Sequence, residues 1–429
     1  MQFNLKLTEK GAIYVTSQQP VDIHGKPYNR SLLVGVLLIG TFCTILNQTL
    51  LTTALPTLMK EFDISASSVQ WLTTGFLLVN GIMIPISAWL INKFSSKKLY
   101  ITAMSTFLIG TIICFVAQDF GMLLTGRLVQ AAGVGVSMPL LQTIMLSIFP
   151  PEKRGAAMGT TGIVIGLAPA LGPTLSGWII DSYTWRDLFG MVIPIVVLVL
   201  ILASFLMKNV IQLSNPSIDV LSVILSTLGF GSLLYGFSSV GDKGWGSPQV
   251  YGFLIVGAIV LCLFTYRQLH LEQPFLELRV FKSKVFTVAA ILSGVTNMAM
   301  IGAEMVLPLY IQNIRGESAF HSGLMLLPGA LVMGLMMPVT GRIFDKIGAR
   351  RLAITGMFIL TAATLPFAFL TKATPIIYII VLYAIRMFGI SMVMMPVTTS
   401  GMNALPMNLL SHGTAVNNTF RQVASSIGT

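Results

Sequence analysis

Charged residues are scarce in this chain of 429 residues. Asp, Glu, Lys and Arg together make up 10% of the sequence and hydrophobic residues make up 54%, whereas a soluble protein carries about 25% charged residues. The phosphate-binding pattern G-x-x-x-x-G-K-[S/T] is absent, and the polar segments are too short to fold into a nucleotidase domain. These features exclude a soluble protein. Energy for any work across a membrane would have to come from a gradient or from another subunit.

Histidine and cysteine are also rare, with four and three copies respectively. Cys43, Cys114 and Cys262 lie inside hydrophobic runs without the spacing of a metal site, so we interpret them as small apolar residues. The histidines are scattered near the ends of runs, and no nucleophile lies at a recognisable spacing from a base. The sequence therefore predicts no metal ion, no cofactor and no enzyme activity.

The hydrophobic residues form runs long enough to cross about 30 Å of hydrocarbon as α-helices. These runs do not alternate between apolar and polar residues, and a bilayer offers no partners to unpaired backbone groups, so we expect helices and an all-α membrane protein. Twelve complete spans are expected, at 31–53, 69–91, 99–117, 121–148, 156–180, 187–207, 217–240, 249–269, 285–311, 321–343, 352–371 and 375–398, and a partial span begins near Gly413.

The net charge of +11 at first suggests a nucleic-acid partner. Most of the 26 Lys and Arg residues, however, fall in the N-terminal segment and in alternate loops, without interleaved aromatic residues. The positive-inside rule places those loops and the N-terminus in the cytoplasm. We therefore expect a multi-pass protein of the cell membrane that is surrounded by lipid and binds no nucleic acid.

The chain contains an internal repeat. Segment 88–98 follows one hydrophobic run and is echoed by segment 341–351 after another, and Arg127 inside a run recurs as Arg386. Two related halves of a membrane protein usually place a substrate path between them. The predicted division is a cytoplasmic segment 1–30, a six-helix bundle 31–208, two inserted spans with a linker 209–284, and a second bundle 285–429. Because the second bundle holds four spans and the start of a fifth, we expect its final two spans to be missing.

Segment 341–351 has the pattern G-x-x-x-D-x-x-G-x-[R/K]-[R/K]. Gly341 lets two helices approach closely, and Asp345 can hold either the basic pair Arg350 and Arg351 or a helix N-terminus. A charged loop that merely follows the positive-inside rule is the alternative. The pattern and its echo resemble the signature loop of the major facilitator superfamily. The resemblance implies two six-helix bundles, here with two extra central helices, and a gate that breaks and reforms as one bundle rocks.

The first copy of this loop departs from the family pattern. Asn92 stands where the family has Asp, and the basic pair is Lys97 and Lys98. Because an asparagine side chain is neutral, any gate at this loop must rest on hydrogen bonds rather than on a charged clamp.

Segment 155–177 is rich in small residues. Gly162 and Gly166 lie one helical turn apart and form a smooth face for close helix contact, and Pro173 can kink the helix. The segment resembles the fifth-helix motif of the antiporter branch of the superfamily, and ordinary small-residue packing is the alternative. The residues that carry the resemblance are Gly162, Gly166, Gly172, Pro173 and Gly177.

Placing an arginine side chain inside a membrane span costs free energy, so such a residue usually faces a water-filled interior or a bonding partner. Arg127, with Gln130 one turn further on, resembles the fourth-helix motif of the superfamily, which implies a role in proton transfer. The alternative is that Arg127 snorkels to the nearby interface.

The stretch around Asn47 resembles the first-helix motif of the 14-helix drug:proton antiporters (EmrB/QacA type, nearest to the lincomycin-resistance branch), in which Asn47 replaces an Asp.

Glu304 is the acidic residue placed deepest in a predicted span. A carboxylate in hydrocarbon can exchange a proton during a transport cycle or bind a cationic drug. The alternative is a glutamate near the outer mouth that is solvated or paired with Arg315.

The resemblance covers the chain from about residue 31. It implies a drug:proton antiporter that exports amphiphilic or cationic compounds while protons run inward, with Arg127, Gln130, Asn47, Glu304 and Arg386 as the proton-coupling or substrate residues. Two alternatives stay open, namely a transporter of a physiological solute or lipid on the same scaffold, and an inactive fragment. The sequence does not indicate the oligomeric state.

Overall fold

The computed structural model describes residues 6–7, 13–14, 20–51, 54–214 and 216–428. In this part of the chain, twelve helices are long and apolar enough to cross a membrane, which confirms the all-α architecture and the twelve predicted spans. The long helices are α1 (Arg30–Leu50), α3 (Ala66–Lys93), α4 (Ser96–Phe115), α5 (Phe120–Ile148), α6 (Arg154–Ser182), α8 (Val192–Leu206), α9 (Val220–Ser238), α11 (Pro248–His270), α12 (Lys284–Leu309), α13 (Ala319–Ile347), α14 (Ala349–Thr364), α15 (Ile376–Asn403) and α16 (Leu410–Gly428).

The helix α16 corresponds to the predicted partial span and is not among the twelve, because polar residues interrupt its apolar surface. The short elements are β1 (Lys6–Leu7), β2 (Ile13–Tyr14), α2 (Leu55–Phe62), α7 (Asp187–Gly190) and α10 (Val240–Lys243). Half of the first predicted segment, 1–30, lies outside the described residues, and the division of the chain into domains stays a prediction.

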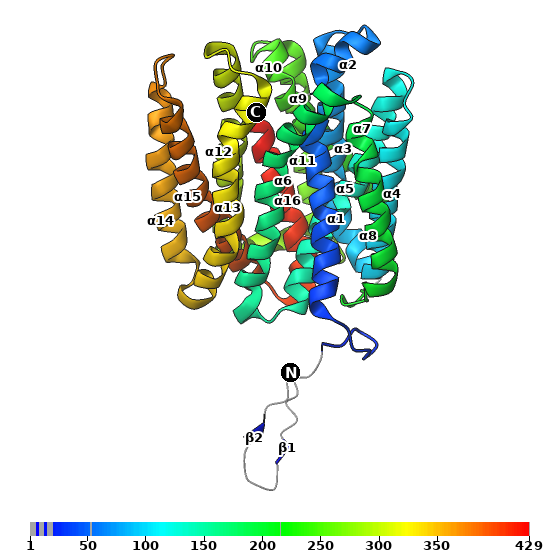
Figure 1. Cartoon of the computed structure of the whole chain (residues 1–429). Helices are drawn as coiled ribbons and strands as arrows, with labels where there is room; N and C mark the ends of the chain where they lie inside the picture. Colours follow the sequence, from blue (N-terminus) through cyan, green and yellow to red (C-terminus); the bar gives the residue numbers. More distant parts are fainter. Residues whose placement is uncertain (1–5, 8–12, 15–19, 52–53, 215, 429) are drawn as a thin grey trace.

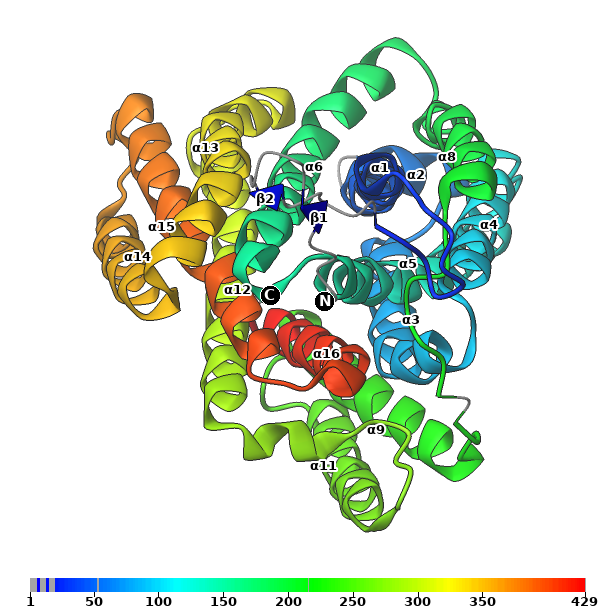
Figure 2. The same ribbon diagram turned by 90° about the horizontal axis from the view of Figure 1, so that it is seen from below.

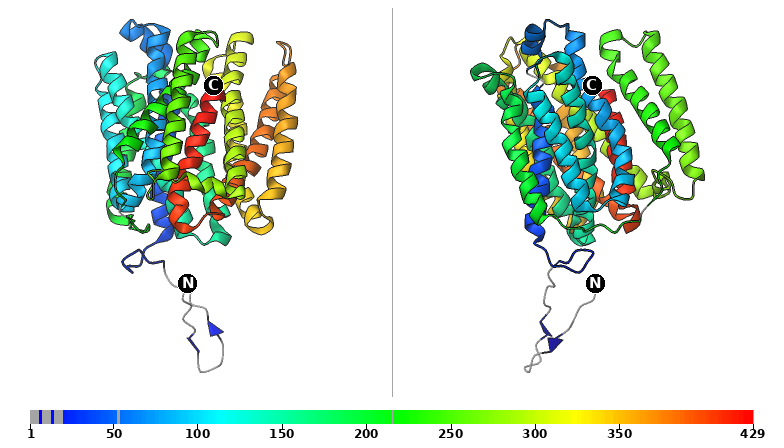
Figure 3. Two further views of the ribbon diagram at one scale, coloured as in Figure 1. Left: turned by 180° about the vertical axis from the view of Figure 1, so that it is seen from behind. Right: turned by 90° about the vertical axis from the view of Figure 1, so that its right-hand side faces the viewer.

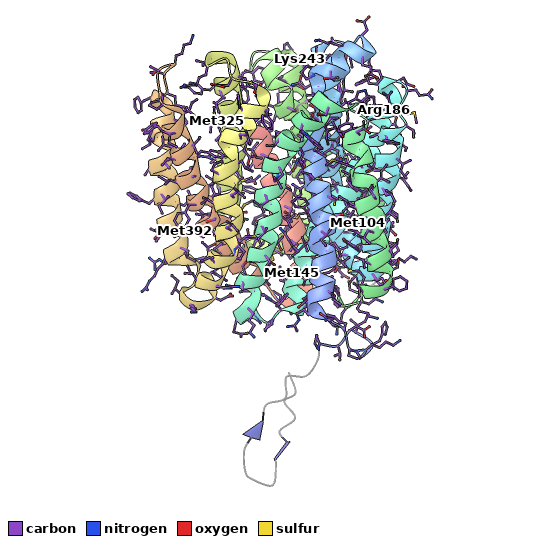
Figure 4. All side chains as sticks on the ribbon, viewed as in Figure 1. Met104, Met145, Arg186, Lys243, Met325 and Met392 are labelled. Carbon is purple, nitrogen blue, oxygen red and sulfur yellow. The ribbon has the colours of Figure 1, made fainter. Side chains whose placement is uncertain are left out.

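The long helices stand side by side as one bundle with the N-terminal segment at one end (Figure 1). We call that end the inner side, because the charge bias predicts it to be cytoplasmic, and the other end the outer side. Figure 4 shows Arg186, which directly precedes α7, and Lys243, the last residue of α10, at the outer side.

The two halves of the bundle meet mainly where α6 packs along α13 and where α16 packs against α3 and α5. Viewed from the inner side, α16 lies between α12 and α3 (Figure 2). The inserted helices α9 and α11 form a hairpin at the edge of the bundle, where α9 contacts both α3 and α16 (Figure 3). The inserted pair therefore lies beside the junction of the two halves.

Local sequence sets the ends of several helices. Asn29, Ser65, Asp119, Ser283 and Ser318 precede long helices, and each side chain accepts a hydrogen bond from a backbone N–H of the first turn. Such caps satisfy donors that have no partner inside the helix. They place the ends of the spans, and hence the loops, at the two faces of the membrane.

The outward surface of the bundle is apolar. Large hydrophobic side chains such as Leu198, Phe205, Ile259 and Phe358 are exposed on it. In water such a surface would be unfavourable, but lipid tails are a matching environment, so helices such as α8 and α11 are apolar on their outward faces as well as their inward ones. Polar side chains are buried inside the bundle instead, and these build the site.

Candidate functional site

A cavity of about 420 Å³ lies between the two halves of the bundle. Its wall comes from α1, α3, α5, α6, α9, α12, α13, α15 and α16, and most of it is apolar. The lining residues belong to the middle and outer parts of the helices, such as Pro173 on α6 and Pro308 on α12. Two charged side chains, Glu304 and Arg421, are among them. An apolar chamber with few polar groups is suited to an amphiphilic ligand.

Arg127, Asn47 and Gln130 form one buried cluster beside this cavity. The Arg127 side chain is 0% exposed, and its Nη1 donates to Asn47 Oδ1 at 2.9 Å and to Gln130 Oε1 at 3.0 Å. Its guanidinium carbon lies 4.2 Å from the centre of the Phe76 ring, which adds a cation–π contact. Gln130 Nε2 donates in turn to Thr111 Oγ1 at 2.8 Å. Arg127 therefore points into the protein and does not snorkel, and its partners are neutral.

Arg386 is the counterpart of Arg127 in the second half and is 1% exposed. Its Nε donates to Thr364 Oγ1 at 3.1 Å, and its Nη2 donates to the carbonyl oxygen of Ala299 on α12. Glu304 lies further along the same helix, half-buried in the cavity wall. Arg386 thus holds the segment of α12 that carries this carboxyl group.

The alternative partner that the sequence offered for Glu304 is engaged elsewhere. Arg315 donates through its Nη1 to the carbonyl oxygen of Thr374 and forms no ion pair with a described acidic residue. Glu304 therefore lines the cavity rather than pairing at the outer mouth. Its role in proton coupling stays a prediction.

Asp345 closes the inner side by binding a helix N-terminus in the other half. Its two carboxylate oxygens accept hydrogen bonds from the backbone N–H groups of Gly155 and Ala156, each at 2.8 Å. These N–H groups belong to the first turn of α6, where the helix dipole also favours a negative charge. Arg350 and Arg351 are exposed and form no ion pair with a described residue. Of the two partners that the sequence allowed for Asp345, the structure shows the helix N-terminus.

The first copy of the loop makes the corresponding contact with neutral groups. Asn92 Oδ1 accepts a hydrogen bond from Ser411 Oγ at 2.8 Å, and Asn92 Nδ2 lies 3.1 Å from His412 Nε2, both at the start of α16. Lys97 donates through its backbone N–H to Asn209 Oδ1 at 3.3 Å and through its Nζ to the carbonyl oxygen of Ser204. Lys98 is exposed. Hydrogen bonds between neutral groups thus stand here in place of a charged clamp, in keeping with the neutral side chain of Asn92.

Further polar contacts join the halves at the inner end of the cavity and below it. Arg154 Nη1 donates to Asn403 Oδ1 at 2.9 Å. The hydroxyl groups of Thr143 and Thr414 lie 2.8 Å apart, and Asn418 Nδ2 donates to Gln142 Oε1 at 2.7 Å. With the two loop contacts, these bonds close the inner half of the junction, while the cavity occupies the outer half.

Replacing Asn92 by aspartate is expected to tighten this closed inner side. The carboxylate would accept a charge-assisted hydrogen bond from Ser411 and would face the start of α16, where a negative charge contributes about 0.3–1 kcal/mol. A cysteine placed at Thr414 reports on the junction. In inverted vesicles its labelling by an impermeant maleimide should slow several-fold in Asn92→Asp and quicken in Asn92→Ala. Equal labelling of both variants would contradict the role of Asn92.

The small residues of α6 are used mainly for helix packing. An ideal Cβ built on Gly162 would lie 2.1 Å from Met337 Sδ on α13, and one on Gly166 would lie 3.0 Å from Met333 Cε. Gly172 faces Thr49 of α1, at 2.1 Å by the same measure, whereas Gly177 meets no atom closer than 4.0 Å. The packing alternative therefore holds for the first three glycines, and Pro173 lines the cavity. Their part in antiport stays a prediction.

Two features of the cavity wall are absent from the residues predicted from the sequence. Arg421 lines the cavity from α16, next to Asn418 and Gln422. The inserted helix α9 contributes Leu234 and Ser238, and Ser238 Oγ lies 3.4 Å from Thr74 Oγ1 of α3. The signal for Arg421 was present as an arginine in the partial span. No signal in the sequence places α9 at the cavity.

The inserted hairpin is also connected to the inner side. Arg267 of α11 binds Asp219, just before α9, through Nε at 2.8 Å and Nη2 at 3.0 Å. These hydrogen bonds hold the pKa of the Asp219 carboxyl below its ordinary value. In the linker that follows α11, the backbone N–H of Glu277 donates to His412 Nδ1 at 3.2 Å. The linker thus contacts the residue that Asn92 approaches.

Comparison with known proteins is consistent with this architecture. The family model described as Major Facilitator Superfamily matches residues 37–429. The uncharacterized MFS-type transporter YcnB of Bacillus subtilis is 57% identical over 407 residues, which cover 95% of this chain and 86% of that protein. The lincomycin resistance protein LmrB of Listeria monocytogenes is 45% identical over 397 residues, 92% of this chain and 84% of that protein.

Solved structures show the same fold at low sequence identity. The human organic anion transporter MFSD10 superposes with a TM-score of 0.66 over 93% of this chain and 92% of that one, at 13% identity. At this level of identity the likeness establishes the arrangement of helices and nothing about the ligand.

Proposed function

Because the chain belongs to the major facilitator superfamily and is closely related to its 14-helix drug:proton antiporters, we propose that it exports amphiphilic or cationic compounds across the cell membrane in exchange for protons. The family makes it a membrane transporter and not an enzyme. The observation that carries the proposal is the apolar cavity of about 420 Å³, closed on the inner side and lined by Glu304. The relative named for lincomycin resistance supports a drug as the substrate.

In the proposed cycle, the two halves rock about the cavity. In the state described here, the Asp345 and Asn92 contacts close the inner side. Breaking both contacts, together with the further polar contacts between the halves at Asn403, Thr414 and Asn418, would separate the starts of α6 and α16 from the opposite half and open the cavity to the cytoplasm. Because none of these contacts is covalent and each involves only one or two hydrogen bonds, the closed state can exchange with an open one at a cost of a few kcal/mol.

Glu304 would couple this exchange to protons. A carboxyl group in an apolar cavity wall is more easily kept neutral than one in water, so it can bind and release a proton as its exposure changes. A proton and the cationic part of a substrate would compete for the same carboxylate. Competition of this kind means that a proton entering from the outer side displaces a compound bound from the inner side.

Dye transport into inverted membrane vesicles tests the proposal. Vesicles that contain the chain are expected to take up ethidium when a pH gradient, acidic inside, is imposed, and to lose that uptake when a protonophore is added. Vesicles without the protein are the control. Absence of uptake of ethidium and of other amphiphilic dyes, with the protein confirmed in the membrane, would contradict export of drugs and favour a physiological solute or lipid as the substrate.

A further inference from the structure

Arg421 is placed differently from the other arginines buried in the bundle. It lines the cavity from α16 although its side chain is only 8% exposed. Its Nη2 donates to Asn297 Oδ1 at 3.0 Å, while its Nε and Nη1 are buried without a partner among the described residues. Arg127 and Arg386 do not line the cavity. Arg421 therefore lines the cavity with a side chain that keeps two unpartnered hydrogen-bond donors among the described residues.

The surroundings of Arg421 do not neutralise its charge. Most of the described polar side chains that line the cavity along α16 and opposite it are amides and hydroxyls, including Asn297, Asn418, Gln422 and Ser425, and the charged one opposite is Glu304 of α12, two turns beyond Asn297. No described carboxylate forms an ion pair with Arg421. Keeping a guanidinium in an apolar site is costly unless its charge and its N–H groups are met by a partner. An anionic group would meet both the charge and the unpartnered N–H groups of Arg421.

We propose that Arg421 binds an anionic group of the substrate, so that the preferred compounds are amphiphiles that carry a carboxylate or sulfonate beside an apolar body. A guanidinium is well matched to such oxyanions. Because Glu304 lines the same cavity from α12, a zwitterion can place its cationic group near Glu304 and its anionic group at Arg421. This inference rests on the proposed function and narrows its substrate class.

A pair of dyes that differ in one carboxyl group provides the test. A rhodamine with a free benzoate is a zwitterion, and its methyl ester is a cation of nearly the same shape. Binding of each to the purified chain in lipid nanodiscs is followed by fluorescence anisotropy. The free acid is expected to bind about tenfold more tightly than the ester, as a buried charge-assisted hydrogen bond would give. Equal binding of the two dyes overturns the inference without the need for any variant.

Variants locate the preference at Arg421. Arg421→Gln should remove the advantage of the free acid and leave binding of the ester within about twofold, and Arg421→Lys should keep part of that advantage because it keeps the charge. Lys284 is exposed at the start of α12, away from the cavity, so Lys284→Gln removes one positive charge elsewhere and, as the control, should behave as the original chain. A free-acid preference that persists in Arg421→Gln would overturn the assignment.

The outcomes separate this inference from the proposed function. If both dyes bind equally and are transported with a proton gradient, export stands and the anion site is wrong. If neither dye binds or is transported, both proposals fail. A preference for the free acid that disappears only in Arg421→Gln supports the anion site, and it supports both proposals when the free acid is also transported with a proton gradient.

Discussion

Replacing Glu304 by glutamine is expected to abolish proton-coupled uptake of dye into inverted vesicles, down to the level of vesicles without the protein. The amide has nearly the same size as the carboxylic acid and fits the same cavity wall, but it cannot take up or release a proton. Transport driven by a pH gradient therefore loses its coupling group, whereas the fold keeps its packing. The measurement is the initial rate of ethidium uptake at equal amounts of protein.

The control for this result is Glu272→Gln. Glu272 is exposed in the linker after α11 and does not line the cavity, so its neutralisation removes the same charge without touching the site. Dye binding adds a second measurement, because acidification should weaken binding of a cationic dye to the original chain and should have little effect on Glu304→Gln. Full uptake by Glu304→Gln would exclude Glu304 as the coupling residue and move the search to other polar groups of the cavity.

The membrane-spanning helices were predictable because amino-acid composition alone identifies a segment that can cross a bilayer. A run of hydrophobic residues long enough to cross the membrane has one stable conformation there, so its position can be read without knowledge of its neighbours. The twelve candidate spans agree with the expected ones for this reason. The helix α16 was harder to predict as a complete span, because Asn417, Asn418 and Arg421 give it a polar face. That face lowers the mean hydropathy of the segment, which was predicted only as a partial span, although Asn418 and Arg421 line the cavity in the structure.

The partners of the predicted site residues were less predictable, because they are distant in the chain. Asp345 had two possible partners in the sequence, and only the fold shows that it meets Gly155 and Ala156. Arg127 could have reached the interface, and the structure instead surrounds it with Asn47 and Gln130. Hydropathy and motif spacing describe each segment separately, whereas these contacts depend on how α1, α5, α6 and α13 pack.

The position of α9 at the cavity was not predictable from the sequence for the same reason, because it depends on how distant segments pack. Its sequence is that of an ordinary apolar span, and nothing in it distinguishes a helix that faces only lipid from one that also lines a cavity. Gly81 of α3 permits the close approach, because an ideal Cβ there would lie 2.4 Å from Leu234 Cδ1. A small residue on one helix thus brings a leucine of another into the cavity wall, and this depends on a pair of segments rather than on either one.

Replacing Gly341 by leucine is expected to prevent closure of the inner side and to abolish transport. An ideal Cβ at this position would lie 2.2 Å from the carbonyl oxygen of Gly155 and 3.3 Å from Ala156 Cα, both backbone atoms of α6 that have little freedom to move. The added side chain would push α13 away from α6. It would separate the Asp345 carboxylate from the two backbone N–H groups that donate hydrogen bonds to it. Overpacking of this kind costs about 1–3 kcal/mol.

Labelling of a cysteine at Thr414 again measures the change. Because about 1.4 kcal/mol corresponds to a factor of ten in an equilibrium constant, the impermeant maleimide should react roughly tenfold faster or more from the inner side in Gly341→Leu. Gly252 of α11 has no atom within 4 Å of its ideal Cβ, so Gly252→Leu is the matched control and should change neither labelling nor transport. Unchanged labelling in Gly341→Leu, with the variant folded in the membrane, would mean that the junction of α6 and α13 does not act as the gate.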